Sequence, residues 1–261
     1  MRRALQEWPI ELAQNPPRQG KPDLTFVIPF RGEDRLPLLK MTVQSILAQR
    51  GVAVECLVVE QSREPVVAGL PPTVIHLHLP CPDDEDGWHK SWAFNEGVRK
   101  AQSQIVVCHD ADILAPCDYG KEICRYIRDE GREFVHLQRF LFRLDETNTR
   151  RLVSTGRVSD CAPEEVWQNW LGGTIAIRKE AFFRIGGYDE QFVDWGGEDN
   201  EFYDRCDVLN KYDFEYLPFI HLWHDPQSTK FSEVRAKNLE LMEELLRIPA
   251  EERIRKLTQA K

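Results

Sequence analysis

Short apolar runs alternate with amphipathic stretches in the first half of the chain, and this alternation predicts strands followed by helices. Four runs have the length and β-branched content of buried parallel strands, at residues 24–30, 54–60, 74–79 and 104–109. Residues 35–50 and 91–102 carry apolar positions at helical spacing, with Asp34 as the expected N-cap and Gly51 as the expected C-terminal glycine of the first helix. This order is typical of a nucleotide-binding α/β half.

The second half is less regular but continues the mixed pattern. Strands are expected at 134–144, 172–177 and 214–221, and helices at 122–130, 179–185, 198–209 and 232–247. We therefore predict an α/β fold in which a Rossmann-like half with a mixed central sheet is fused to an acceptor-binding half. The predicted parts are an N-terminal arm (1–23), one domain (24–228, divided into 24–115 and 116–228) and a C-terminal helical segment (229–261).

The composition limits the classes of molecule that the protein is expected to bind and the compartment in which it is expected to work. The chain has 261 residues and a formal net charge of -9, which argues against general nucleic-acid binding. Its seven scattered cysteines form no CxxC pair, so reduced thiols and a cytoplasmic location are expected. We find no signal peptide and no apolar stretch long enough to span a membrane, which leaves peripheral contact as the expected mode of any membrane association.

Two carboxylates, Asp110 and Asp112, follow the strand at 104–109 directly. Ligands of such sheets bind at the carboxyl ends of the strands, where Pro29, Phe30 and Glu60 also fall. Oxygen ligands suit Mg²⁺ or Mn²⁺, and such a cation would neutralise a leaving diphosphate. An Asp-x-Asp pair alone is more often an ordinary acidic turn, and the placement after a strand favours the metal.

Two histidines, His221 and His224, follow the last predicted strand. Nitrogen ligands at the same metal would favour Mn²⁺ over Mg²⁺. Residues three apart face opposite sides of a regular strand, so both bind only if the chain turns here. The alternative is one structural and one surface histidine. We expect at least one of them to be a ligand, with a slight preference for His224.

The segment Trp195-Gly196-Gly197-Glu198-Asp199 is the most unusual stretch of the chain. The glycines let the backbone approach a ligand closely, and the indole offers an apolar face to a sugar ring. Acidic residues in the first turn also suit the helix dipole, so capping explains part of the pattern. A carboxylate here can act as a general base, and Asp199 is the candidate base, with Glu198 for acceptor binding.

Cationic and aromatic residues near the other strand ends add to the expected binding site. Lys90 stands at the start of a predicted helix and could contact a diphosphate, while Trp88 could pack on the nucleotide. Arg31 and Arg35 follow the first strand and could do similar work. Each of these cations, taken singly, is more often a solvated surface residue.

Taken together, these motifs resemble the GT-A fold glycosyltransferases, most closely the β-1,4-galactosyltransferase type and its bacterial family-2-like relatives. The resemblance spans roughly residues 24 to 226. The motifs that carry it, in order, are Ile28-Pro29-Phe30-Arg31, Trp88-His89-Lys90-Ser91 before Asn95, Asp110-Ala111-Asp112, Gly172-Gly173, Trp195-Gly196-Gly197-Glu198-Asp199 and His224. Each motif is weak or moderate alone, and their shared order makes the signal specific.

The resemblance implies a role for each matched residue. Asp112 would bind Mn²⁺ together with His224, and His221 stands where the galactosyltransferases have a methionine ligand. Glu198 would bind the acceptor sugar, and Asp199 would deprotonate its hydroxyl in a displacement with inversion. The expected nucleotide-sugar site comprises Pro29, Phe30, Arg31, Arg35, Glu60, Trp88, Lys90, Asp110, Ala111 and Asp112, and the acceptor site Gly173, Trp195, Gly196, Gly197 and Glu198.

The expected reaction is transfer of a hexose or N-acetylhexosamine from a UDP-linked donor to a hydroxyl of a glycan or other acceptor. Three alternatives stay open. The retaining polypeptide N-acetylgalactosaminyltransferases are similar too, but they have asparagine where this chain has Asp199. A nucleotidyltransferase could use the same α/β half, although it has little use for the Trp195–Asp199 segment. A carbohydrate-binding module would bind sugar without turnover.

Overall fold

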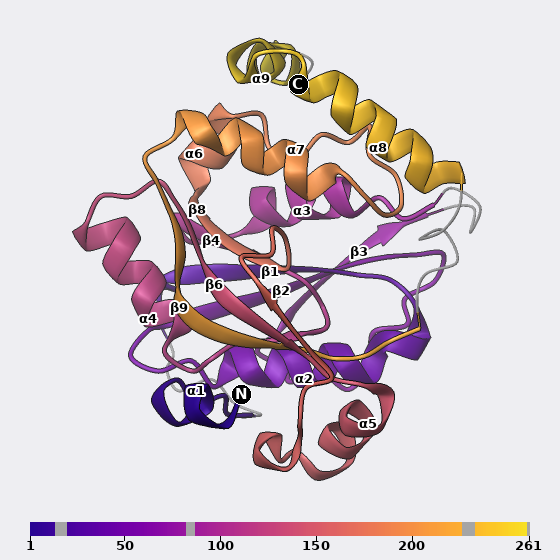
Figure 1. Cartoon of the computed structure of the whole chain (residues 1–261). Helices are drawn as coiled ribbons and strands as arrows, with labels where there is room; N and C mark the ends of the chain where they lie inside the picture. The colour runs from indigo at the N-terminus through magenta and orange to yellow at the C-terminus, as the bar shows by residue number, and fades with distance from the viewer. Residues whose placement is uncertain (14–19, 82–86, 226–232, 260–261) are drawn as a thin grey trace.

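The predicted strands of the N-terminal half pair in parallel within one mixed sheet in this computed structural model (Figure 1). The structure describes residues 1–13, 20–81, 87–225 and 233–259. Within them the sheet order is β3-β2-β1-β4-β8-β6-β9-β5, and β7 pairs with β6. The strands are β1 (Leu24–Phe30), β2 (Val54–Ser62), β3 (Ile75–Pro80), β4 (Ile105–His109), β5 (Ile113–Leu114), β6 (Phe134–Arg143), β7 (Glu165–Gln168), β8 (Thr174–Arg178) and β9 (Lys211–His221).

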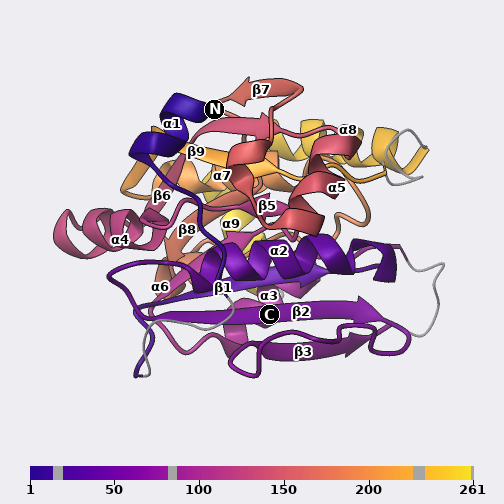
Figure 2. The same ribbon diagram turned by 90° about the horizontal axis from the view of Figure 1, so that it is seen from below.

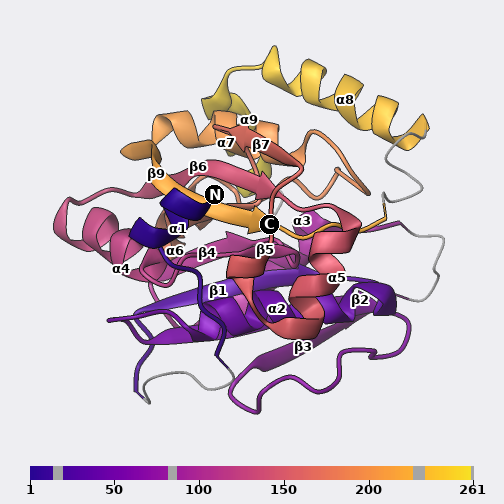
Figure 3. The same ribbon diagram turned by 60° about the horizontal axis from the view of Figure 1, so that its bottom comes forward.

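Helices cover both faces of this sheet. They are α1 (Arg2–Glu7), α2 (Leu36–Leu47), α3 (Lys90–Lys100), α4 (Tyr119–Cys124), α5 (Glu146–Thr155), α6 (Lys179–Arg184), α7 (Glu198–Arg205), α8 (Glu233–Leu246) and α9 (Ala250–Gln259). Figure 2 shows α2 lying across the face that is turned toward the viewer, and Figure 3 shows α8 on the opposite side of the molecule from α2. The mixed α/β architecture predicted from the sequence is confirmed.

The central strand β1 explains why both faces need a cover. All seven of its residues are buried. Successive side chains of a strand point to opposite faces, so Phe26 and Ile28 join the apolar cluster under α2. Val27 joins the cluster on the other face together with Ala93 and Phe94 of α3. A strand buried on both sides reads as a continuous apolar run, which is the pattern that predicted it.

Strand pairing in the second half brings the carboxyl ends of β4 and β9 together. His109 at the end of β4 pairs with Thr174 at the start of β8, and the Asp110 amide donates to the Gly173 carbonyl at 2.8 Å. The short β5 then pairs with the end of β9, with Ile113 opposite His221. The chain between β4 and β5 is Asp110-Ala111-Asp112, so this pairing places both acids at one edge of the sheet.

Several elements differ from the prediction. Helix α2 begins at Leu36 rather than at Arg35, and no side chain caps it, because Glu33–Arg35 form a separate 3-10 turn that includes Asp34. Helices α5 and α9 and strands β5 and β7 were not expected. Gly51 follows the helix, which already ends at Leu47, with a positive φ of 72°.

The N-terminal end of the chain carries more structure than the prediction gave it. The expected N-terminal arm contains α1, whose Ala4 is buried together with Ile10 in an apolar cluster of the body. Residues 14–19 of that arm, and the expected boundary between 228 and 229, lie outside the described residues. None of the helices in the described part of the chain has the length and apolar character that a membrane crossing requires.

Candidate active site

A cavity of about 420 Å³ opens at the carboxyl ends of the strands. The predicted site residues that line it are Pro29, Phe30, Arg31, Arg35, Trp88, Lys90, Asp110, Ala111, Asp112, Gly173, Trp195, Gly196, Gly197, Glu198, Asp199, His221 and His224. These residues come from both predicted halves of the domain. The fold therefore gathers in one place side chains that lie up to two hundred positions apart in the sequence.

Asp112 meets both histidines at one end of the cavity. Its carboxylate lies 3.1 Å from Nε2 of His224 and 3.9 Å from Nε2 of His221, and one ligand atom from each residue lies within 4.8 Å of the others. Although burial favours the neutral acid, the surrounding His221, His224 and Arg35 hold the pKa of Asp112 well below its usual range. Burial lowers the pKa of His221 to about 4, so this imidazole is neutral at neutral pH.

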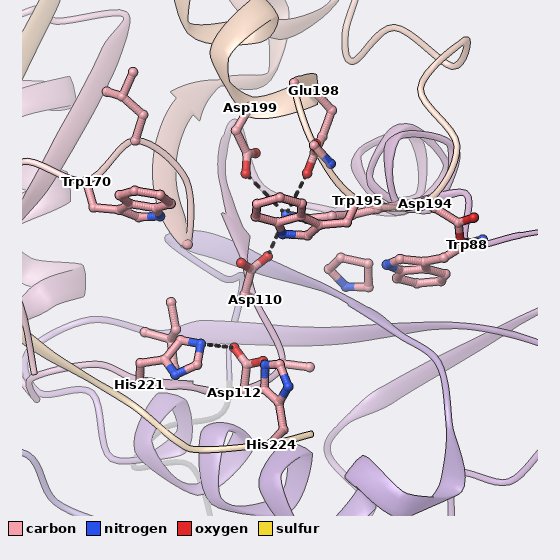
Figure 4. A pocket seen from close by; sticks show the side chains of 18 of the residues that line it. Trp88, Asp110, Asp112, Trp170, Asp194, Trp195, Glu198, Asp199, His221 and His224 are labelled. Carbon is pink, nitrogen blue, oxygen red and sulfur yellow. Dashed lines mark hydrogen bonds and ion pairs between the residues drawn. The ribbon is translucent and has the colours of Figure 1, made fainter. Parts of the chain in front are cut away.

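The turn that brings the histidines together has a simple cause. β9 ends at His221, and the next amide, that of Leu222, donates to the carbonyl of Asp112 at 2.9 Å. The chain thus leaves the strand at this point, and the rule that residues three apart face opposite sides no longer applies. Figure 4 shows His221 and His224 on either side of Asp112.

Lys90 binds three carboxylates at the other end of the cavity. Its Nζ atom lies 3.1 Å from Asp110, 3.4 Å from Glu198 and 3.3 Å from Asp199. Figure 4 shows these three carboxylates turned toward a common point. Burial alone would lower the pKa of this lysine, but the three acids raise it well above its usual value. Lys90 is therefore a fixed positive charge that joins the turn after β4 to the first turn of α7.

Burial raises the pKa of both carboxyls in that first turn. For Asp199 the raising effect of burial and of Asp110 is opposed by Lys90, and for Glu198 burial and Asp199 act together against Lys90. Glu198 also accepts a hydrogen bond from the Gly196 amide at 3.1 Å. A carboxylate with a raised pKa, held beside a cavity, is suited to accept a proton.

The glycines around these acids are required by close packing. Gly197 has a φ of 90°, and a Cβ there would lie 3.1 Å from the main-chain oxygen of Asn238 on α8. Gly172 has a φ of 96°, and a Cβ there would lie 2.5 Å from Oδ2 of Asp199. A side chain at Gly172 would therefore displace Asp199, so the loop before β8 fixes one wall of the acid pair.

Comparison with known proteins identifies the fold and the family. A model described as glycosyl transferase family 2 matches residues 25–188, which is more than half of the chain. The chain belongs to glycosyl transferase family 2. A second model, described as the N-terminal domain of galactosyltransferase, matches residues 156–225 of this glycosyltransferase. The second match contains the Trp195–Asp199 segment and both histidines.

Curated relatives of this family 2 glycosyltransferase match over short segments. A chondroitin synthase from Escherichia coli is 58% identical over 31 residues, which are 12% of this chain and 4% of that protein. A probable N-acetylgalactosaminyltransferase 9 from Caenorhabditis elegans is 40% identical over 53 residues, which are 20% of this chain and 9% of that protein. The matched segments thus cover less than a tenth of either relative.

Solved structures share the fold over most of the chain. A mannosyltransferase from Pyrobaculum calidifontis in complex with GDP-Man and Mn²⁺ has a TM-score of 0.58 at 18% identity and covers 95% of this chain and 70% of its own. The catalytic domain of Drosophila β1,4-galactosyltransferase 7 in complex with xylobiose has a TM-score of 0.51 at 17% identity and covers 83% and 79%. Both are GT-A glycosyltransferases, so the predicted GT-A fold is confirmed.

One predicted site residue of the glycosyltransferase does not line the cavity. The Glu60 side chain is fully buried and turned toward its own loop, where it accepts hydrogen bonds from the amides of Val66 and Val67 and from Ser62, with His76 at 2.7 Å. These four partners occupy both oxygen atoms of the carboxylate. The strand-end position of Glu60 suggested a ligand contact, but its side chain organises the loop after β2 instead.

Other lining residues of the glycosyltransferase were missed. Arg143 ends β6, Trp167 lies on β7, Trp170 follows it, and Arg235 projects from α8. The spacing of the two tryptophans was a usable signal, because large aromatic residues in a polar stretch often mark a binding surface. The arginines gave no such signal, since strand pairing and helix docking alone bring them to the cavity.

Proposed function

We propose that this enzyme transfers a hexose or N-acetylhexosamine from a UDP-linked nucleotide sugar to a hydroxyl of a carbohydrate acceptor. The proposed transfer requires a divalent metal ion and inverts the configuration of the anomeric carbon. The observation that supports this most is the division of the cavity into two acidic groups. Asp112 stands with two histidines at one end, and Glu198 and Asp199 stand with Lys90 at the other. A donor diphosphate at the first group and an acceptor hydroxyl at the second would place the sugar between them.

The residues at the donor end fit a divalent cation. Asp112, His221 and His224 would hold it with one oxygen and two nitrogen atoms, a mixed set that suits Mn²⁺ better than Mg²⁺. Nδ1 of His221 is buried and has no hydrogen-bond partner within the described residues, which leaves the ring free to orient toward the cavity. Such a cation, when bound, neutralises the negative charge of a leaving diphosphate.

Residues around the donor end are suited to the rest of a nucleotide sugar. Arg35 lies 3.8 Å from Asp112, close enough for its guanidinium to reach a phosphate beside that carboxylate. Pro29, Phe30 and Arg31 at the end of β1, and Trp88 before α3, form an apolar and cationic wall for the nucleoside. Figure 4 shows Trp88 on the opposite side of the cavity from Trp170.

Asp199 is the proposed base. Its raised pKa favours uptake of a proton from an acceptor hydroxyl, while the positive charge of Lys90 opposes that rise and favours the ionised form that a base needs. Glu198 is more deeply buried and is held by the Gly196 amide, so its proposed role is to bind and orient the acceptor sugar. As Asp199 takes the hydroxyl proton, the acceptor oxygen would bond to the anomeric carbon on the face opposite the bond to the diphosphate, which breaks. This displacement inverts the configuration of the anomeric carbon.

A panel of nucleotide sugars with Mn²⁺ and a mixed set of sugar acceptors tests this function. We expect release of a nucleoside diphosphate with at least one donor, and an NMR spectrum of the product that shows inverted anomeric configuration. Release of pyrophosphate would identify a nucleotidyltransferase, and a retained configuration would contradict Asp199 as the base.

The seven cysteines are free and buried, which supports a reducing, cytoplasmic environment for the reaction.

A further inference from the structure

Three side chains, from β6, from β7 and from the loop after β7, form one wall of the cavity, which we call the β7 wall: Arg143, Trp167 and Trp170. The guanidinium of Arg143 lies over the Trp167 ring at 3.9 Å from its centroid, and the Trp167 and Trp170 rings are 4.5 Å apart. All three residues line the cavity. The pairing of Leu141 with Trp167 and of Arg143 with Glu165 fixes this arrangement.

The β7 wall contains an exposed ring and a polar atom that no other side chain of the described residues occupies. Trp170 is 43% exposed, a large value for an indole, and an exposed indole beside a cavity is typical of a surface that binds a ligand. Nε of Arg143 is buried without a hydrogen-bond partner in the described part of the chain. Its guanidinium meets only the exposed carboxylate of Glu165 among the described acids, at 3.5 Å. Such an ion pair in water is weak and readily exchanged.

The wall stands next to the proposed base. Trp170 precedes Gly172 by two residues, and a Cβ on Gly172 would lie 2.5 Å from Oδ2 of Asp199. Two extended residues span about 7 Å at most, which is close to the length of one sugar ring. Figure 4 shows Trp170 on the same side of the cavity as Asp199. A sugar whose hydroxyl faces Asp199 would therefore reach the wall with the other side of its ring.

We propose that the β7 wall makes this enzyme specific for an acceptor that carries a carboxylate, as a uronic acid does. The proposal rests on the proposed function of the site and names its acceptor class. The indole faces suit the C–H face of a pyranose ring. The planar guanidinium of Arg143 matches a carboxylate, which it can bind through two parallel hydrogen bonds.

The donor diphosphate is the competing anion, because Arg143 is the strand partner of His221. The direction of the side chain favours the acceptor. The Arg143 guanidinium is turned toward β7, where it stacks on Trp167 and meets Glu165. Arg35 is instead turned toward Asp112 at 3.8 Å, and it is the arginine placed for a phosphate. The two arginines thus divide between acceptor and donor.

Two acceptors that differ only at C6 test the proposal: p-nitrophenyl β-D-glucuronide and p-nitrophenyl β-D-glucoside. With Mn²⁺ and the donor selected by the panel, we expect kcat/KM to be at least about tenfold higher for the glucuronide, as a charge-assisted hydrogen bond gives. In Arg143→Gln this preference should disappear through a loss for the glucuronide alone, with the donor KM unchanged. Arg143→Lys should keep part of it.

Arg139→Gln is the matched control, because Arg139 lies on the same strand and bonds the Asn169 side chain outside the cavity. It should leave the preference unchanged. Equal kcat/KM for the two acceptors, including no transfer to either, would overturn the proposal while donor cleavage still supports the proposed function. A raised donor KM in Arg143→Gln would assign Arg143 to the diphosphate and overturn it too. If no nucleotide sugar is cleaved, both proposals fail.

Discussion

Nη1 of Arg253 lies 2.7 Å from Oε1 of Glu201, so α9 is joined by a buried ion pair to the helix that carries Glu198 and Asp199. Arg205 donates to the same carboxylate from within α7, at 2.7 Å. The Nδ2 atom of the Asn238 side chain on α8 donates to the Val193 carbonyl at 2.7 Å, in the loop that leads to Trp195. The C-terminal helices therefore hold the end of the cavity that contains Glu198 and Asp199 in place (Figure 3).

Loss of that ion pair should destabilise the protein. Arg253→Met would leave Glu201 with one of its two cationic partners in a fully buried environment, and breaking a buried pair commonly costs about 3 kcal/mol or more. Urea unfolding measures the free energy of unfolding. Arg247→Met is the control, since Arg247 pairs with Glu243 on the surface at 3.9 Å and should change stability by less than about 1 kcal/mol. Equal losses in the two variants would contradict this account of α9.

Elements with a strong apolar period could be predicted from the sequence, and polar elements could not. The β1 and β4 strands are buried on both faces, so their residues form continuous apolar runs. β7 has one partly buried residue and otherwise exposed ones, and α5 buries only two residues of ten. Nothing in their local sequence distinguishes them from loops. Helix α9 was missed for a similar reason, because the residue it buries is an arginine.

The candidate site could be predicted where its residues follow strand ends or glycines. Asp112 and Asp199 are in such positions, and the fold brings them to one cavity. Glu60 follows the same rule but faces its own loop, because the chain after β2 turns back and offers its amides to that carboxylate. Arg143 also ends a strand, β6, but that position alone did not predict which way its side chain turns. Its place depends on the register between β6, β7 and β9, which only the folded chain determines.

Replacement of Asp112 should abolish the Mn²⁺-dependent activity. Asp112→Ala removes the only carboxylate from the candidate set of three ligands, and neutral imidazoles alone do not compensate the cation charge. We expect Mn²⁺ binding measured by calorimetry to weaken by at least about tenfold, together with loss of Mn²⁺-stimulated diphosphate release. Asp207→Asn, at an exposed acid that pairs with Lys211, should leave both unchanged. Unaltered Mn²⁺ affinity in Asp112→Ala would show that the ligands lie elsewhere.

Replacement of Asp199 should affect the chemical step and spare the donor. Asp199→Asn keeps the size and the packing against Gly172 but cannot accept a proton at neutral pH. Loss of a general base commonly reduces kcat on the order of a hundredfold or more. We expect such a fall in kcat with little change in the KM of the nucleotide sugar. Full turnover by the variant would rule out Asp199 as the base.

The pH dependence should report the charge of Lys90. Burial raises the pKa of Asp199, and the positive charge of Lys90, at 3.3 Å, opposes that rise. A base must be deprotonated to act, so activity falls as the pH drops through its pKa in the free enzyme. Lys90→Met removes the opposing charge, and the pKa of Asp199 then rises further. We therefore expect the acid limb of the kcat/KM profile to move to higher pH in Lys90→Met than in the wild type.

Asp110 shares Lys90 with Asp199 and provides the control for this shift. Asp110→Asn removes a negative charge that raises the pKa of Asp199, so the acid limb should move to lower pH. Opposite shifts in Lys90→Met and Asp110→Asn are the signature of one carboxyl that responds to both charges. An acid limb that stays fixed in both variants would mean that a group other than Asp199 accepts the proton.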